Sequence, residues 1–214
     1  MKNYAIILTH NRPTLLYQCV QSIIDQVDMV IIVDNASNPS VNILQSGIEV
    51  IRDPEQPPNI AKMWNQQINR IAEQNSLEEM WNIALLCDDT IIPPYWYIKV
   101  STAMRDVGVS AASTHSYAPI SSSYRLTSLT NGADRMCPWA FMIAGESRLR
   151  ADESLHWWYC DTDLDWQARV NGGTLIVDGP IVPNERIGEY TQRPELSLQA
   201  KEDERTFYAK WFGK

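Results

Sequence analysis

Charged and hydroxyl side chains follow three apolar segments of the sequence. Thr9 and Arg12 come after the first segment, Asp34 comes after the second, and the pair Asp88 and Asp89 comes after the third. Ligands of open α/β sheets bind at the carboxyl ends of the strands, so these side chains are candidates for one shared site. A guanidinium suits a diphosphate, and carboxylates accept hydrogen bonds from a base and a ribose. The pattern therefore favours a nucleotide site.

Each of these positions also has a simpler interpretation. Asn11, Asp34 and Asp89 are residue types that commonly cap helices or shape turns, and singly each is best interpreted in that way. Two other kinds of nucleotide site are disfavoured, because the sequence has neither a Gly-x-Gly-x-x-Gly turn nor a Gly-x-x-x-x-Gly-Lys-Ser/Thr loop. The joint placement at one sheet edge is what supports nucleotide binding.

Alternating strands and helices are needed to position these side chains. The apolar runs predict strands at 4–8, 29–33, 48–51, 81–86, 109–113, 139–144 and 174–177. Apolar residues at helical spacing predict helices at 13–26, 59–74, 93–104, 162–170 and 196–211. The polar stretch 116–131 is expected to be a loop or a hairpin. The order of strand, helix and strand favours a parallel α/β sheet in a single domain.

Length and composition argue against several classes of protein. The chain has 214 residues and a formal net charge of -8, which gives no general attraction to nucleic acid and disfavours it as an acceptor. The apolar runs are too short to cross a bilayer and no signal peptide is recognised, so we expect a cytoplasmic protein without a membrane span. The cysteines are widely spaced, which favours buried free thiols over a zinc site.

The first part of the sequence resembles one enzyme family. The segment Ile-Ile-Leu-Thr-His-Asn-Arg at 6–12, followed after a helix by Val-Ile-Ile-Val-Asp-Asn-Ala-Ser at 30–37, is similar to the opening of family-2 glycosyltransferases. The resemblance implies the GT-A fold, a Rossmann-like, mixed and mostly parallel sheet flanked by helices. It also implies a single domain at 1–214, with a nucleotide-sugar half at 1–90, an acceptor half at 91–192 and a C-terminal helix at 193–214.

By this resemblance, the chain transfers a sugar from a nucleotide-sugar donor, with UDP favoured and GDP or dTDP left open. The donor contacts are assigned to Thr9, Arg12, Asp34, Asn65 and Asp88. Asp34 would accept from the base and Asp88 from the ribose. Asp88 and Asp89 would form the Asp-x-Asp-type motif, in which Asp89 is the metal ligand. Hard divalent cations prefer carboxylate oxygen, so Mg²⁺ or Mn²⁺ is the expected cofactor.

The stretch 151–164 resembles the acceptor side of the same family. The resemblance implies that Asp161 is the general base, which takes a proton from the acceptor hydroxyl and leads to inversion at the anomeric carbon. Asp161 is alternatively the N-cap of the helix that follows, and both roles can coexist. The aromatic run 157–159 suits stacking against an acceptor sugar, although aromatic residues more commonly pack in cores.

Three features depart from the family's pattern. Cys160 stands where many relatives have Glu, and Ile60 stands where a Gly is usual. No histidine follows His156, although many relatives supply a late one to the metal or the diphosphate. The candidate substitutes are Glu185, Arg186 and Glu189. These changes leave open an alternative, a GT-A module that binds a nucleotide or glycan without turnover. The acceptor is left open among a glycan, a protein and a small molecule.

Overall fold

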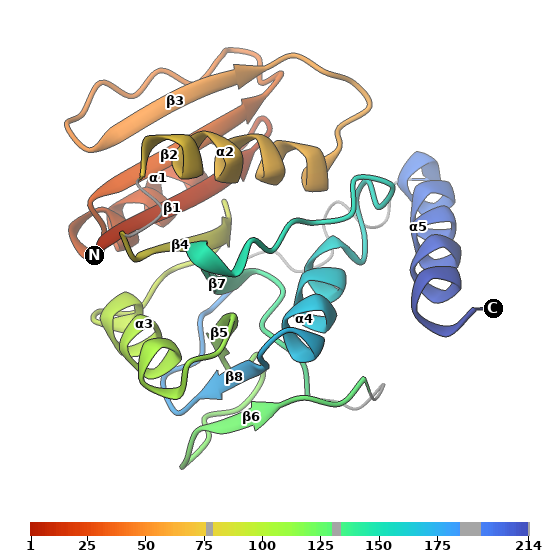
Figure 1. Ribbon diagram of the computed structural model, residues 1–214. Coiled ribbons are helices and arrows are strands. Elements are labelled where there is room, and N and C mark those ends of the chain that lie inside the picture. Colours follow the sequence, from red (N-terminus) through yellow and green to blue (C-terminus); the bar gives the residue numbers. More distant parts are fainter. Residues whose placement is uncertain (76–78, 130–133, 185–193, 214) are drawn as a thin grey trace.

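The computed structural model describes residues 1–75, 79–129, 134–184 and 194–213 (Figure 1). Within these ranges eight strands form one sheet, in the order β3-β2-β1-β4-β7-β5-β8-β6. The strands are β1 (Lys2–Thr9), β2 (Met29–Asn35), β3 (Ile48–Asp53), β4 (Trp81–Cys87), β5 (Ala111–Thr114), β6 (Tyr124–Leu126), β7 (Ala140–Ala144) and β8 (Thr174–Val177). The helices are α1 (Pro13–Ile23), α2 (Ile60–Gln74), α3 (Trp96–Val107), α4 (Cys160–Val170) and α5 (Pro194–Phe212). No helix in the described ranges is long and apolar enough to cross a bilayer.

The first half of the sheet is parallel. β1 lies between β2 and β4 and pairs with both in the parallel direction, and β2 pairs in the same direction with β3. The register sets Thr9 beside Asp34 and Leu8 beside Cys87. The carboxyl ends of β1, β2 and β4 therefore open on the same edge of the sheet, as the sequence predicts.

The second half of the sheet contains the changes of direction. β7 runs antiparallel to both of its neighbours, β4 and β5. β5 and β8 are parallel, and the short β6 pairs antiparallel with β8 at the other sheet edge. The predicted fold class, a mixed and mostly parallel sheet flanked by helices, is confirmed. The segment 116–131, expected to be a loop or a hairpin, contributes β6 in its described part.

Two hydrophobic layers cover the two faces of the sheet, because successive side chains of a strand point to opposite faces. On β1, Ile7 packs in the layer of α1 and α3, whereas Ile6 packs in the layer of α2 and α4. Figure 1 shows α2 crossing in front of β1 and β2. Helical spacing supplies the covering side chains, which on α1 are Leu16, Cys19, Val20 and Ile23. Each large apolar side chain buried in this way contributes about 1.5–3 kcal/mol.

α2 and α5 begin within two residues of the predicted positions, and the starts of α3 and α4 differ from the prediction for a reason visible in the backbone. α3 begins at Trp96 and not at 93, because its N-cap Tyr95 has a left-handed backbone with φ 62°. α4 begins at Cys160 and not at 162, and its N-cap is Tyr159, which is also left-handed with φ 64°. Asp161 lies inside the first turn of α4. The interpretation of Asp161 as the N-cap is therefore wrong.

The cysteines are free thiols, and Cys19, Cys137 and Cys160 are buried. Burial raises the pKa of Cys19 to about 12 and that of Cys137 to about 11, so both stay protonated at neutral pH. Cys87 is only partly buried as a residue. The prediction of buried free thiols is confirmed for the other three.

A buried ion pair on α4 fixes a neighbouring stretch of chain. Arg169 donates to the two carboxylate oxygens of Asp165, at 3.1 and 2.6 Å, and each side chain is 1% exposed. The same guanidinium donates to the carbonyl oxygens of Ser128 and Asp134, both at 3.0 Å. Asp165 also accepts from the Met136 amide at 3.3 Å. The pair therefore ties the segment 134–136 to α4.

Removing this buried cation should cost far more stability than removing an exposed one. In Arg169→Met the buried Asp165 charge loses its partner, so the free energy of unfolding is expected to fall by about 3–5 kcal/mol. The matched control is Arg205→Met on an exposed position of α5, which is expected to change it by less than about 0.5 kcal/mol. Urea unfolding followed by circular dichroism measures both. Equal losses would contradict a structural role for the pair.

Candidate active site

A cavity of about 530 Å³ lies at the carboxyl ends of β1 and β4. Thr9, the last residue of β1, and Arg12 in the loop that follows line it, and Asp88 and Asp89 line it after β4. Asp161 reaches the same cavity from the first turn of α4. The sheet edge that the sequence predicts as a nucleotide site and the predicted base therefore border the same cavity.

Asp88 and Asp89 are held by hydrogen bonds from three residues in two segments of the chain. Arg12 Nη1 donates to Asp88 Oδ1 at 3.0 Å and to Asp89 Oδ2 at 2.9 Å. Thr9 Oγ1 donates to the second oxygen of Asp88 at 2.7 Å. Asn184 Nδ2 donates to the second oxygen of Asp89 at 3.0 Å. All four carboxylate oxygens are engaged, so the orientation of both acids is fixed in the unliganded protein.

The loop after β1 presents Arg12 by way of a left-handed residue. Asn11 has φ 55°, a conformation that asparagine adopts more readily than most side chains. Its backbone amide donates to Ser37 Oγ at 2.9 Å, and its side-chain oxygen accepts from the Asn38 amide at 2.7 Å. The loops after β1 and β2 therefore brace each other, and Asn11 has the turn-forming role that its residue type suggests.

Burial raises the pKa of Asp88 to about 6, against the lowering effects of the Thr9 hydrogen bond and the Arg12 charge. The neighbouring Asp89 carboxylate adds to the rise. An opposite charge nearby favours the ionised form of an acid, whereas a like charge disfavours it. The positive charge of Arg12 therefore favours the ionised form of Asp88, a buried carboxyl group with a second acid beside it.

Asp161 has a different environment. Burial raises the pKa of its carboxyl group, and the charge of Arg135 and the backbone amides at the start of α4 lower it again in part. A carboxylate with a raised pKa is a stronger base than an ordinary one once it is ionised. The two ends of the cavity thus differ in their partners, with two carboxylates hydrogen-bonded to Arg12 at the sheet edge and a single carboxylate near Arg135 at α4.

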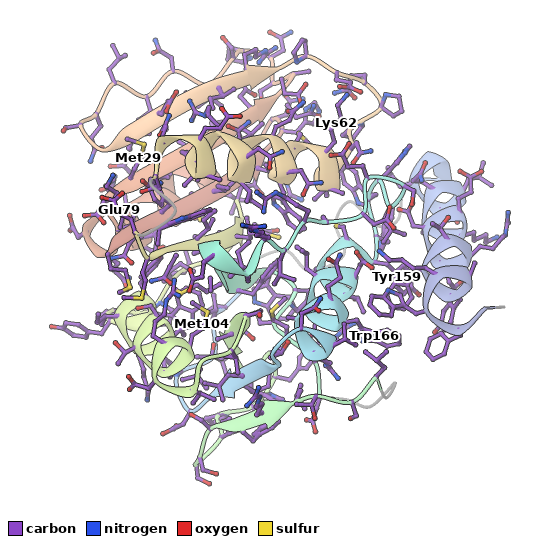
Figure 2. The ribbon with its side chains drawn as sticks, in the orientation of Figure 1. Met29, Lys62, Glu79, Met104, Tyr159 and Trp166 are labelled. Carbon is purple, nitrogen blue, oxygen red and sulfur yellow. The ribbon has the colours of Figure 1, made fainter. Side chains whose placement is uncertain are left out.

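Three successive aromatic residues form a wall of the cavity, and we call Trp157, Trp158 and Tyr159 the aromatic wall. All three are half-buried, and the rings of Trp157 and Trp158 lie 5.9 Å apart at an interplanar angle of 45°. Tyr159 stacks on Phe207 of α5 with ring centroids 4.9 Å apart. Figure 2 shows the Tyr159 side chain beside α5. The aromatic wall therefore combines core packing with exposure to the cavity.

Asp34 is not among the described residues that line the cavity. It is 1% exposed, and it accepts from the amides of Ser37 and Val41, both at 3.0 Å. Burial raises its pKa, but hydrogen bonds from Ser37, Val41 and Arg52 outweigh that effect and lower the pKa overall. Asp34 therefore anchors the loop after β2, and its contact with a nucleotide base stays a prediction.

Asn65 also lies away from the described cavity lining. Its Nδ2 donates to the Ala151 carbonyl at 2.8 Å and to Glu153 Oε1 at 3.0 Å, and its Oδ1 accepts from the Ala151 amide at 2.9 Å. These bonds tie α2 to the chain that leads into the aromatic wall. The predicted contact of Asn65 with the donor stays untested.

Two polar residues of the cavity were not identified from the sequence. Arg135 lies in a stretch for which no element is predicted, and Asn184 is 95 residues from Asp89, to which it donates. Neither has a motif around it, although Asn184 directly precedes the candidate substitutes for the missing histidine. Those candidates, Glu185, Arg186 and Glu189, lie outside the described residues.

The pair Asp88 and Asp89 offers oxygen donors of the kind that a hard divalent cation prefers. In the described ranges, no group of three or more His, Cys, Asp or Glu side chains is arranged to hold a metal ion. Mg²⁺, however, is usually bound through one or two carboxylates together with substrate phosphates and waters. The described residues therefore fit a cation that binds together with a diphosphate.

The sequence matches a protein-family model over most of its length. The model of glycosyl transferase family 2 matches residues 4–162. This chain belongs to glycosyl transferase family 2. It is therefore a glycosyltransferase, as the resemblance predicts, and the match includes every residue of the cavity except Asn184. No curated protein matches the sequence.

Structures of S. aureus TarS are similar in fold. A structure of TarS 1-349 has a TM-score of 0.63 and 12% identity, and the match covers 100% of this chain and 76% of that chain. TarS 1-349 in complex with UDP-GlcNAc has a TM-score of 0.61 and 12% identity, and the match covers 94% of this chain and 66% of that chain. A longer TarS structure has a TM-score of 0.63 and 13% identity, and the match covers 85% of this chain and 36% of that chain. These structures support the GT-A fold of this family-2 chain.

The electrostatic role of Arg12 predicts a pH-dependent loss of stability in Arg12→Met. The raised pKa of Asp88 means that its ionisation costs folding free energy, and this cost is present above the folded pKa and absent at low pH. Without Arg12 the cost grows, so the free energy of unfolding is expected to fall by about 2 kcal/mol at pH 8 and by clearly less at pH 5.

Denaturant unfolding at the two pH values, with the exposed α5 variant Lys201→Met as the control, tests this prediction. A deficit of the same size at pH 5 and pH 8 would mean that Arg12 stabilises the fold through packing and not through its charge.

Proposed function

We propose that this chain is an inverting glycosyltransferase that moves the sugar of a UDP-sugar to an acceptor hydroxyl, with a divalent cation at Asp89 and Asp161 as the general base. The observation that carries the proposal is that one cavity joins the carboxylates after β4 to the carboxylate in the first turn of α4. The reaction needs both, because the leaving diphosphate and the acceptor hydroxyl lie on opposite sides of the anomeric carbon. Membership of family 2 supplies the reaction type.

The proposed donor is a UDP-sugar. A structure of similar fold, TarS 1-349, was solved in complex with UDP-GlcNAc, which supports UDP as the nucleotide. In this chain Arg12 supplies a guanidinium for the diphosphate, and Thr9 and Asp88 supply the neighbouring polar groups for the ribose. Asp34 is assigned to the base and Asn65 to a further donor contact, as the family resemblance implies.

The proposed cofactor is Mn²⁺ or Mg²⁺ at Asp89. When bound, such a cation would neutralise negative charge on the departing UDP. Arg12 and Asn184 hold one oxygen each of the Asp89 carboxylate, and each oxygen keeps a further lone pair for another ligand. The side chain is thus oriented in advance and still able to bind a cation.

Asp161 is proposed to accept the proton of the acceptor hydroxyl. As the proton moves to the carboxylate, the acceptor oxygen bonds to the anomeric carbon, and the bond from that carbon to the diphosphate oxygen breaks on the opposite face. Attack opposite to the leaving group inverts the configuration. The raised pKa of Asp161 suits this role, and Arg135 favours the ionised form that the role requires.

The aromatic wall is the proposed contact for the acceptor, since flat indole rings stack on the apolar faces of sugars. A glycan, a glycosylated protein or a small glycoside fits this chemistry, and the net charge of -8 disfavours nucleic acid. The cytoplasmic location stays a prediction. The competing function is a module that binds donor or glycan without turnover, and it is favoured by the departure at Cys160.

Replacing the proposed base should abolish turnover and spare donor binding. Asp161→Asn keeps the size of the side chain but removes the proton acceptor, so sugar transfer is expected to fall by about 10²–10⁴-fold. UDP release from UDP-GlcNAc or UDP-glucose, with a panel of glycoside acceptors, measures the rate. The control Asp106→Asn, on an exposed position of α3, should keep the wild-type rate. Wild-type turnover in Asp161→Asn would require a different base.

Donor binding should depend on a cation through Asp89. A ligand at about 100 times its Kd stabilises the native state by about 2.7 kcal/mol, so UDP-GlcNAc with Mn²⁺ should raise Tm by several degrees. We expect most of that rise to be lost with EDTA and in Asp89→Asn. A rise that is unchanged by EDTA would remove the cation from the proposal.

The same thermal measurement separates the two functions and the possible donors. GDP-mannose and dTDP-glucose serve as comparison donors, and a larger rise with either would replace UDP as the nucleotide. A rise with one donor but no release of nucleotide, with any acceptor or with water, would favour the binding module over the transferase.

A further inference from the structure

The carboxylate of Asp203, on α5, holds the backbone of the aromatic wall. Asp203 is 0% exposed, and its two oxygens accept from three successive amides, those of His156 at 3.1 Å and of Trp157 and Trp158 at 2.8 Å each. Gln199, one turn earlier on α5, donates to the same carboxylate at 2.7 Å. Hydrogen bonds to an ionised group are stronger than those between neutral groups, so this is a firm attachment of a segment that lies in no helix or strand.

A second set of contacts joins α5 to the first turn of α4. Trp211 Nε1 donates to Asp163 Oδ1 at 2.8 Å, and Lys210 Nζ lies 2.7 Å from the same oxygen. Asp163 belongs to the first turn of α4, two residues after Asp161. Phe207, 1% exposed, packs between Tyr159 and Trp166. Figure 2 shows the side chains of Tyr159 and Trp166 between α4 and α5.

Between these two attachments the backbone adopts an uncommon conformation. Tyr159 has φ 64°, a left-handed value that is rare for a bulky side chain and costs on the order of 1–3 kcal/mol. Such a conformation persists only where its surroundings enforce it. Asp203 holds the residues just before Tyr159, and Phe207 stacks on its ring. The direction in which α4 starts, and hence the location of Asp161, depends on this junction.

We propose that Asp203 is a positioning residue of the transfer reaction. It touches no reacting atom and acts by holding the backbone amides of residues 156–158. This keeps Trp157 and Trp158 at the cavity and sets the start of α4 so that Asp161 lines the cavity. The inference rests on the proposed function. It extends the active site to α5, which lies beyond the residues 4–162 that the family model matches.

Hydrogen exchange in the wild-type protein tests the attachment directly. The segment 156–158 belongs to no helix or strand, so without Asp203 its amides would exchange rapidly. We expect slow exchange at Trp157 and Trp158, comparable to the amides inside α4. Fast exchange at both residues would overturn the proposal without any variant being made.

A variant tests the catalytic consequence. Asp203→Asn keeps the side-chain size but turns an amide N–H group toward backbone donors, so it should loosen 156–158 selectively. We expect faster exchange in that segment and a fall in kcat for UDP-GlcNAc transfer or hydrolysis by about tenfold or more, because small misplacements of reacting groups are costly. KM for the donor and the donor-dependent rise in Tm should be unchanged. The control Glu202→Gln removes the same charge from an exposed position of the same helix.

These measurements distinguish failure of the Asp203 proposal from failure of the proposed transferase function. Wild-type kcat in Asp203→Asn, or equal losses of donor binding and kcat, would overturn the positioning role. A wild-type protein that binds donor but neither transfers nor hydrolyses it would overturn the transferase and, with it, the catalytic role of Asp203. Slow wild-type exchange together with a selective loss of kcat supports the proposal, and a variant that does not fold leaves the wild-type exchange as the deciding measurement.

Discussion

The structure depends first on the parallel pairing of β1 with β2 on one side and β4 on the other. This register makes three strands end at the same level, and the residues that follow them share one space although they are far apart in sequence. Thr9 and Arg12 can reach Asp88 and Asp89 only because β1 and β4 are direct neighbours. The chemistry of the sheet edge is thus set by backbone hydrogen bonds in the core.

The antiparallel strand β7 adds a second requirement. Because it runs against β4, it begins beside the carboxyl end of β4 and ends at the opposite edge of the sheet. The stretch that leads into β7 therefore lines the cavity, and the chain after β7 returns to the same edge, where Asp161 borders the cavity with Asp88 and Asp89. The antiparallel strand thus adds a second stretch of chain to the wall of the cavity.

The sequence predicted the parts of the molecule that depend on local periodicity and on motifs. Strands and helices were located within a few residues, because the apolar side chains of this two-layered core recur with the period of each element. The boundaries at Tyr95 and Tyr159 were missed, because left-handed tyrosines have no local signature. For Asp34 and Asn65 the residue types suit ligand contacts, yet the structure engages both with neighbouring backbone.

The residues that the sequence did not reveal act over long distances along the chain. Arg135 depends on a segment tied down by a buried ion pair, and Asn184 meets Asp89 across 95 residues. Asp203 stands within the charged run 201–205, where composition alone suggests a solvated helix surface. Asp203 differs from its charged neighbours in being buried, and it is buried because its carboxylate accepts hydrogen bonds from the amides of residues 156–158, which are distant in sequence.

The attachment of α5 affects which part of the chain could be exchanged between related proteins as one unit. Sequence similarity defines a module that stops within α4, at a point where both the sheet edge and Asp161 are already included. Yet the amides of residues 156–158 find their acceptor outside that module. In a chimaera that exchanges modules at the boundary of similarity, the partner sequence would have to provide a buried carboxylate of its own. The segment needed to hold the aromatic wall therefore extends beyond the segment that sequence similarity identifies.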